Sequence, residues 1–207
     1  MKGTEYMTFK EWADEALEAD WENPIYLSVV TDGLSKTKSS VVAVITAEEI
    51  DAQIVVKEYG ILGGDASKTE AFTGFTHQMH RDNITAPSDM PTLPMLFDGR
   101  VVVSYSVNKF MMPFLEKLQT ETILPVLGRA SDVLDIQSMY NVVFSEQGLI
   151  RGNTASFLRT QAPAGKLEKL FDNIPIADCL KQEVYNMPVY RQKVYILYWL
   201  YKYLRTQ

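Results

Sequence analysis

Residues 26–34 read YLSVVTDGL, an apolar and β-branched run that ends in a polar turn. Such a run is typical of a buried strand that leads into a loop. Two similar runs follow, and polar or charged segments at 33–36 and 47–51 separate the three. The pattern predicts adjacent strands at 25–31, 40–46 and 54–59.

Helical and strand-like patterns alternate in the rest of the chain. Thr76 can cap a short helix at 77–82 through its side-chain oxygen. Residues 101–115, VVVSYSVNKFMMPFL, read as a strand, a turn and a helix. Another strand is predicted at 133–136, and helices are predicted near Asn153, at 166–172, at 176–186 and from Pro188. The sequence therefore predicts a single α/β domain at 24–207.

In this order, the segments resemble the DnaQ-like (DEDD-type) 3′-5′ exonucleases. The first strand of that family ends in Asp-x-Glu-Thr-Thr-Gly-Leu. Matching residues 31–34, Thr-Asp-Gly-Leu, to the end of that motif places Ser28 on the Asp and Val30 on the Glu. Residues 72–76, FTGFT, are similar to the Thr/His-Gly-Ile-Thr element that follows the third strand of the family.

The segment 101–115 resembles the family's second motif, an apolar strand followed by His-Asn-x-x-Phe-Asp. Anchoring the match on Phe110 and the following Phe114-Leu115 places Met111 on the second aspartate. Tyr105 and Ser106 stand for His-Asn if Asn108 or Lys109 is an insertion. Asp135 falls in the next family strand, where the aspartate is usually supportive and not a metal ligand.

The resemblance covers roughly residues 25 to 205 and implies an RNase H-like fold, a mixed sheet flanked by helices. Family members cleave phosphodiesters with two divalent ions held by four carboxylates. Ser28, Val30 and Met111 cannot replace carboxylates, and the chain has no Asp or Glu after Glu183 and no His after His80. We therefore expect no catalytic residues, no bound metal and no cofactor.

The leading hypothesis is a pseudo-exonuclease that binds single-stranded nucleic acid or a protein through the former substrate cleft. One alternative is an active metal-dependent 3′-5′ exonuclease whose Mg²⁺ or Mn²⁺ ligands have moved to Asp32, Asp135 or other acids. A second is a protein-interaction module that uses an N-terminal acidic helix. That helix is predicted within residues 1–23, because Phe9, Trp12 and Leu17 recur at helical spacing opposite an acidic face.

The last predicted helix mixes tyrosines with cations. Its apolar stripe predicts packing on the sheet, with the cations along the outer face. The same mixture could stack bases and contact phosphates. The candidate nucleic-acid contacts are Tyr105, Asn108, Lys109, Arg191 and Lys193.

Bulk properties narrow the function classes. The chain has 207 residues and a net charge of −6, so any binding to nucleic acid needs a local basic patch. The single Cys179 excludes an internal disulfide. His77 and His80 alone are too few ligands for a zinc site. No apolar segment is long enough to cross a membrane, and we expect a cytoplasmic protein.

Overall fold

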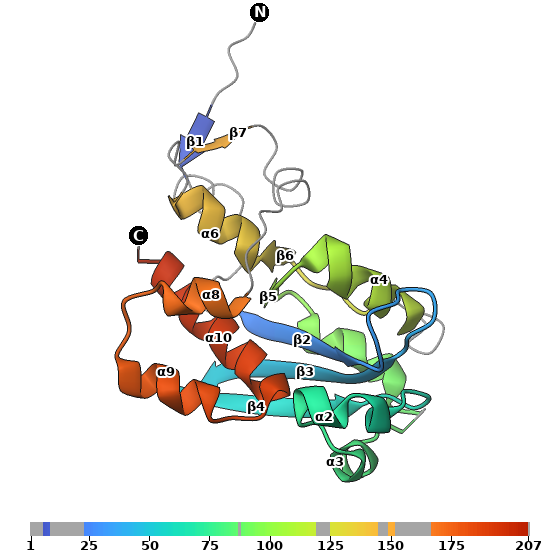
Figure 1. Cartoon of the computed structure of the whole chain (residues 1–207). Helices are drawn as coiled ribbons and strands as arrows, with labels where there is room; N and C mark the ends of the chain where they lie inside the picture. Colours follow the sequence, from blue (N-terminus) through green and yellow to red (C-terminus); the bar gives the residue numbers. More distant parts are fainter. Residues whose placement is uncertain are drawn as a thin grey trace, which may run out of the picture.

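The computed structural model describes residues 6–8, 23–86, 88–118, 125–144, 149–151 and 167–206. Its main feature is a five-stranded sheet of order β4-β3-β2-β5-β6 (Figure 1). Strand β2 pairs antiparallel with β3 and parallel with β5, so the sheet is mixed. The strands are β2 (Ile25–Thr31), β3 (Val41–Ile50), β4 (Gln53–Gly60), β5 (Val101–Ser104) and β6 (Asp132–Asp135).

The three predicted strands at the start of the sheet are confirmed, but the predicted break at 47–51 is wrong. Strand β3 continues to Ile50, because Asp51 and Ala52 form a two-residue turn with φ of 50° and 60°. Both central residues of a tight hairpin turn of this kind have positive φ. The charged residues before the turn are paired: Glu48 contacts Lys57 at 3.0 Å and Arg100 at 2.9 Å.

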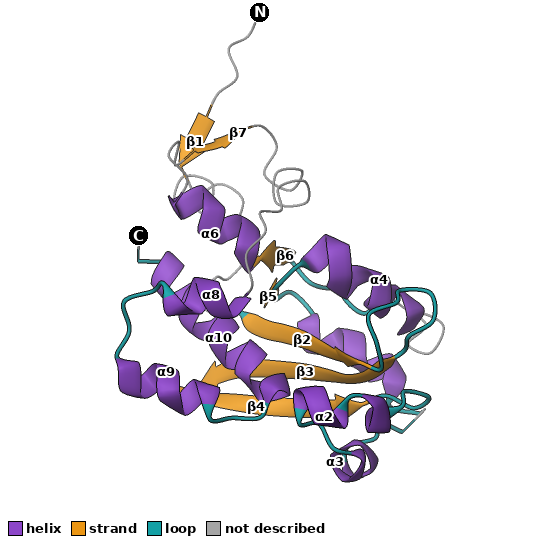
Figure 2. Ribbon diagram, viewed as in Figure 1, coloured by secondary structure: helices purple, strands orange, loops and turns teal. Residues whose placement is uncertain are grey.

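Helices cover both faces of the sheet, as the parallel pairs around β5 require. Helix α10 (Val189–Leu204) crosses one face, next to α8 (Leu167–Asp172) (Figure 2). Tyr26 is buried below α10, with its ring 5.5 Å from Tyr198 and 5.9 Å from Tyr201. The opposite face packs on the 3₁₀ helix η2 (Met90–Phe97) and on α4 (Met112–Leu115). Strand β2 is thereby buried on both sides.

Some of the remaining elements agree with the sequence patterns, whereas η1 (Ala66–Lys68), α2 (Glu70–Thr73), η4 (Glu116–Leu118) and α6 (Ile136–Phe144) were not predicted. The Thr76 cap is confirmed, since its Oγ1 accepts a hydrogen bond from the Met79 N–H at 3.0 Å. Pro188 directly precedes α10, and the extended Ala177 delays the start of the helix predicted at 176–186 to Asp178. The others are α3 (His77–Asp82), π-helix η3 (Val107–Met111) and α9 (Asp178–Tyr185).

A second sheet pairs β1 (Tyr6–Thr8) with β7 (Leu149–Arg151) in antiparallel register. Residues 9–22, where the acidic N-terminal helix is predicted, lie outside the described residues, as does the helix predicted near Asn153. Within the described ranges, no helix combines the length and the apolar character that crossing a membrane requires.

Gly64 allows the loop after β4 to lie directly on β3. A Cβ atom at this position would meet the Val41 carbonyl oxygen and would lie 2.6 Å from the Val42 Cα. Both are backbone atoms of a central strand, which cannot move without separating paired strands. The glycine therefore fixes the approach of the loop to the sheet.

We predict that Gly64→Ala lowers the free energy of unfolding by about 2–3 kcal/mol, because overpacking against backbone is not relieved by a side-chain rotation. Urea denaturation measures this change. Leu62→Ala in the same loop is the control, since Leu62 is 56% exposed and its loss should stay within about 0.5 kcal/mol. Equal stability of the two variants would contradict the packing role of Gly64.

Candidate binding cavity at strand β2

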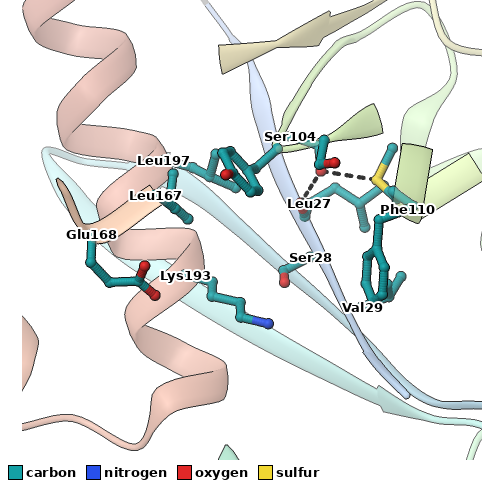
Figure 3. A pocket seen from close by; sticks show the side chains of 12 residues that line it. Leu27, Ser28, Val29, Ser104, Phe110, Leu167, Glu168, Lys193 and Leu197 are labelled. Atoms are coloured by element: carbon teal, nitrogen blue, oxygen red, sulfur yellow. Dashed lines mark hydrogen bonds between the residues drawn. The ribbon is translucent and has the colours of Figure 1, made fainter. Parts of the chain in front are cut away.

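A cavity of about 300 Å³ lies between β2, the segment after β5, and helices α8 and α10 (Figure 3). Its size is at the lower end of the range for small-molecule sites. Most of its walls are apolar, with a few polar groups from different elements. The lining residues are Leu27, Ser28, Val29, Ser104, Tyr105, Ser106, Phe110, Met111, Leu167, Glu168, Lys193 and Leu197.

Strand β2 places Ser28, but not Val30, in the cavity. Tyr26, Ser28 and Val30 share the face of the strand toward α10, because side chains alternate along a strand. Val30 is 4% exposed and packs within the core under α10. Of the two positions that the sequence analysis matched to the first carboxylate pair of the exonucleases, Ser28 offers a hydroxyl group and Val30 is closed by apolar packing.

Met111 lies beside the inner end of the cavity. Its Sδ is 2.9 Å from the Ser104 Oγ, and the Ser104 hydroxyl donates to the Leu27 carbonyl at 2.6 Å. Ser104 is 2% exposed and Met111 is 1% exposed, so both are held firmly by their surroundings. A thioether thus occupies the position matched to the second aspartate.

The π-helix η3 lies in the segment matched to the second motif. The Ser106 carbonyl accepts from both the Phe110 N–H at 2.9 Å and the Met111 N–H at 3.3 Å. A bond from residue i to i+5 takes up one more residue than an α-helical turn. A π-helical turn at this place is compatible with one inserted residue between Tyr105-Ser106 and Phe110-Met111, and the register of the motif stays a prediction.

Ser106 enters this helix through a left-handed conformation that Asp135 holds in place. The φ and ψ of Ser106 are 54° and 45°, which is uncommon for a residue with a Cβ. The Asp135 carboxylate accepts from the Ser106 N–H at 3.3 Å, the Val107 N–H at 3.0 Å and the Gln137 N–H at 3.0 Å. Burial raises the pKa of the Asp135 carboxyl, and these N–H donors oppose that rise. Its oxygens bind backbone, as a supportive aspartate would.

We predict that Asp135→Ala destabilises the protein by about 3 kcal/mol, since it leaves buried N–H groups without an acceptor. Asp135→Asn should cost roughly half as much by the same reasoning, because one amide oxygen can still accept from Ser106 and Gln137. Urea unfolding of both variants tests whether Ala costs more stability than Asn, provided that the m-value is unchanged. Equal losses for Ala and Asn would mean that the hydrogen bonds do not account for the stability.

Lys193 is the main correction to the sequence analysis. The apolar stripe of α10 is confirmed, with Val194, Leu197 and Tyr201 buried. The cations were expected along the outer face, but Lys193 reaches from α10 into the cavity toward Ser28, with Glu168 of α8 beside it (Figure 3). Burial lowers the pKa of the Lys193 ammonium, and the charge of Glu168 opposes that shift. The spacing of Lys193 from Tyr190 (i+3) and Leu197 (i−4) was the signal for this orientation.

The other candidate nucleic-acid contacts are separated by the fold. Tyr105 lines the cavity, whereas Lys109 is exposed on η3 outside the lining. Asn108 lies in the same π-helix. Arg191 forms an ion pair with Glu58 of β4 at 2.6 Å, so its guanidinium fixes α10 to the sheet edge.

Phe110, Glu168 and Leu197 line the cavity without having been assigned to a site from sequence. Phe110 served only to align a motif, and Leu197 only as a core position. Glu168 lies on a short helix about 140 residues after Ser28, and no local pattern connects the two. Tertiary packing alone brings Glu168 to the cavity.

Among the described residues, no group of three or more His, Cys, Asp or Glu side chains is close enough to hold a metal ion. Of the described residues that line the cavity, Glu168 is the one carboxylate. His80 does not form a pair with His77, because its Nε2 lies 2.9 Å from the Ile61 carbonyl oxygen. The cavity as described is therefore a site of one cation, one carboxylate and several hydroxyl groups.

The fold is shared with exonuclease I. The apo form of exonuclease I superposes with a TM-score of 0.60 at 11% identity, covering 89% of this chain and 42% of that chain. E. coli exonuclease I in complex with a dA16 oligonucleotide gives 0.61 at 12% identity, with 89% and 41% covered. The product-bound form gives 0.59 at 12% identity, with 89% and 43% covered.

These similarities confirm the predicted RNase H-like exonuclease fold, a mixed sheet flanked by helices. At such identities they establish the fold alone. The chain spans about two fifths of the length of the exonuclease I chains. No protein-family model matches the sequence, and no curated protein matches it.

We predict that Lys193→Met raises Tm at neutral pH, since it removes the cost of burying a charge while keeping the length of the side chain. Each kcal/mol gained in the free energy of unfolding raises Tm by about 2–4 °C for a chain of this size. Below its lowered pKa, Lys193 is charged in both the folded and the unfolded state. The folded state then bears the full free-energy cost of burying that charge. The gain in Tm of Lys193→Met over the parent should therefore shrink as pH rises from that pKa toward the ordinary lysine value of 10.5.

Lys202→Met is the matched control, because Lys202 lies on the same helix but is 50% exposed and paired with Glu49. It should give no rise in Tm. Thermal unfolding from pH 6 to pH 10 compares the two variants. A Tm for Lys193→Met below that of the parent at neutral pH would contradict a desolvated ammonium.

Proposed function

We propose that this chain is a pseudo-exonuclease, which binds single-stranded nucleic acid in the cavity at β2 and does not hydrolyse it. The observation that supports this most directly is the position of Lys193, with its ammonium directed toward Ser28. The exonuclease reaction needs two divalent cations at this strand. A fixed positive charge beside their position opposes their binding, because like charges repel.

The acids available for a relocated metal site are already engaged. The Asp32 Oδ1 accepts from the Ser40 N–H at 2.6 Å, and the Asp32 N–H donates to the Ser40 carbonyl at 3.1 Å. Asp32 thus closes the loop between β2 and β3. Asp135 accepts backbone N–H groups with both of its oxygens. Freeing either carboxylate for a metal would leave buried or half-buried donors unpaired, which favours the non-catalytic function.

Nucleic acid is favoured over a protein partner by the chemistry of the cavity. Lys193 supplies one positive charge in a chain whose net charge is −6. The rings of Tyr105 and Phe110 line the same space and offer surfaces for base stacking. A solved relative in fold, E. coli exonuclease I, is known in complex with a dA16 oligonucleotide. A local site of this kind is consistent with binding despite the acidic surface.

We predict no release of mononucleotides from 5′-labelled single-stranded DNA or RNA, with either Mg²⁺ or Mn²⁺. Denaturing gel electrophoresis over several hours measures the product, and E. coli exonuclease I on the DNA substrate is the positive control. Ser28→Asp should not restore activity, since Val30 and Met111 match the positions of two further acids and the last helix contains no Asp, Glu or His. Chelator-sensitive release that is lost in Asp135→Asn or Asp32→Asn would favour the relocated metal site instead.

A further inference from the structure

The cavity combines one positive and one negative side chain without joining them in an ion pair. Lys193 and Glu168 interact through their charges, but no contact within 4.0 Å links them among the described residues. The other cations of α10 for which ion pairs are found, Arg191 and Lys202, contact Glu58 and Glu49. Unlike Arg191 and Lys202, Lys193 directs the N–H donors of its ammonium into the cavity.

Burying an ammonium without a paired carboxylate is costly, and such a charge is normally compensated by a partner. Burial lowers the pKa of the Lys193 ammonium, and a bound anion would oppose that shift. The position of the ammonium near Ser28 adds a hydroxyl donor within the same space. An ammonium and a hydroxyl group together are suitable donors for a phosphate oxygen.

The carboxylate of Glu168 limits the charge of that ligand. Among the described residues that line the cavity, the charges of ionised Lys193 and Glu168 cancel, and a singly charged anion brings their sum to −1. A phosphate monoester carries about −1.5 to −2 at pH 7 and would face Glu168 with a larger repulsion. A phosphodiester carries a single charge and therefore faces a smaller repulsion from Glu168.

We infer that Lys193 is a built-in cation that replaces the metal ions of this fold and binds a phosphodiester group of a single strand, while Glu168 disfavours phosphate monoesters. This inference rests on the proposed function and specifies its ligand. Binding is then independent of divalent ions. The aromatic rings of Tyr105 and Phe110 flank the nucleotide that the phosphate joins, and the 300 Å³ of the cavity suits a single such unit.

The test is fluorescence anisotropy with 5′-fluorescein-labelled dT12 in EDTA, using the full chain. Lys193→Met should weaken binding about tenfold or more, the usual effect of losing a charged hydrogen bond. Lys193→Arg should stay within about threefold of the parent, since the charge is kept. Lys202→Met removes the same net charge from the same helix and should change affinity less than about twofold, because one exposed, paired charge contributes little.

A second comparison tests the role of Glu168. The same oligonucleotide with a 3′-phosphate places a monoester at the end of the strand, and free 5′-dTMP as competitor offers a monoester alone. We expect the parent protein to bind both of them more weakly than the 3′-hydroxyl strand. Glu168→Gln should reduce the difference between the 3′-phosphate and 3′-hydroxyl strands.

The outcomes separate this inference from the proposed function. Equal affinities for Lys193→Met and Lys202→Met, or binding that appears only with Mg²⁺, would overturn the phosphate site and leave a non-hydrolytic binding protein. Preference for the 3′-phosphate strand would overturn the selection by Glu168. Hydrolysis of dT12 by the parent protein in Mg²⁺ would overturn the proposed function itself. Failure of the parent protein to bind any of the strands would overturn both.

Discussion

The shape of the cavity depends on the carboxylate of Asp135. This side chain, 8% exposed at the end of β6, collects N–H groups from the turn after β5 and from the start of α6. Its bond to Ser106 stabilises a left-handed backbone that would otherwise cost about 1–3 kcal/mol. From that turn the π-helix begins, and its extra residue sets the rotation at which Phe110 and Met111 reach the cavity. One buried acid therefore positions a wall of the site without facing the ligand.

Helix α10 forms the opposite wall of the cavity. Apolar packing fixes the rotation of this helix, and its charged residues must fit that rotation. The buried stripe of this helix fixes its rotation on the sheet through Tyr198 and Tyr201, whose rings meet Tyr26 edge-on. The Arg191–Glu58 pair fixes its first turns against β4. With the helix held at both places, Lys193 stays on the side of α10 that lines the cavity. A charged side chain on a helix face that otherwise carries apolar residues is a common sign of a functional constraint.

Much of the sheet could be predicted from the sequence, because its signals are local. β2 and the Thr76 cap depend on β-branched runs and on a hydroxyl group at the right offset, both visible in single segments. The error at 47–51 arose because Glu48 and Glu49 are poor strand residues in isolation, and their partners Arg100 and Lys202 are distant in sequence. The same limit explains why Glu168 was not connected with Ser28. The orientation of Lys193 was accessible from its spacing to Leu197, but the expectation that cations face outward outweighed it.

The charges of the residues in the cavity can be understood together, by comparison with a two-metal site. Four carboxylates around two divalent ions form a unit in which the charges compensate, and removing the metal alone would leave like charges within a few ångströms of one another, with strongly raised pKa values. Removing one acid would leave an ion with too few ligands. A protein of this fold without the ions avoids both the repulsion among the carboxylates and the incomplete metal site only when all of the acids are replaced. In the match that the sequence predicts, Ser28, Val30 and Met111 would be such a joint replacement, by a hydroxyl group and two apolar side chains. In the proposed site, Lys193 supplies part of the positive charge that metal ions bring to the exonucleases, in a form that attracts phosphate but cannot activate water at neutral pH.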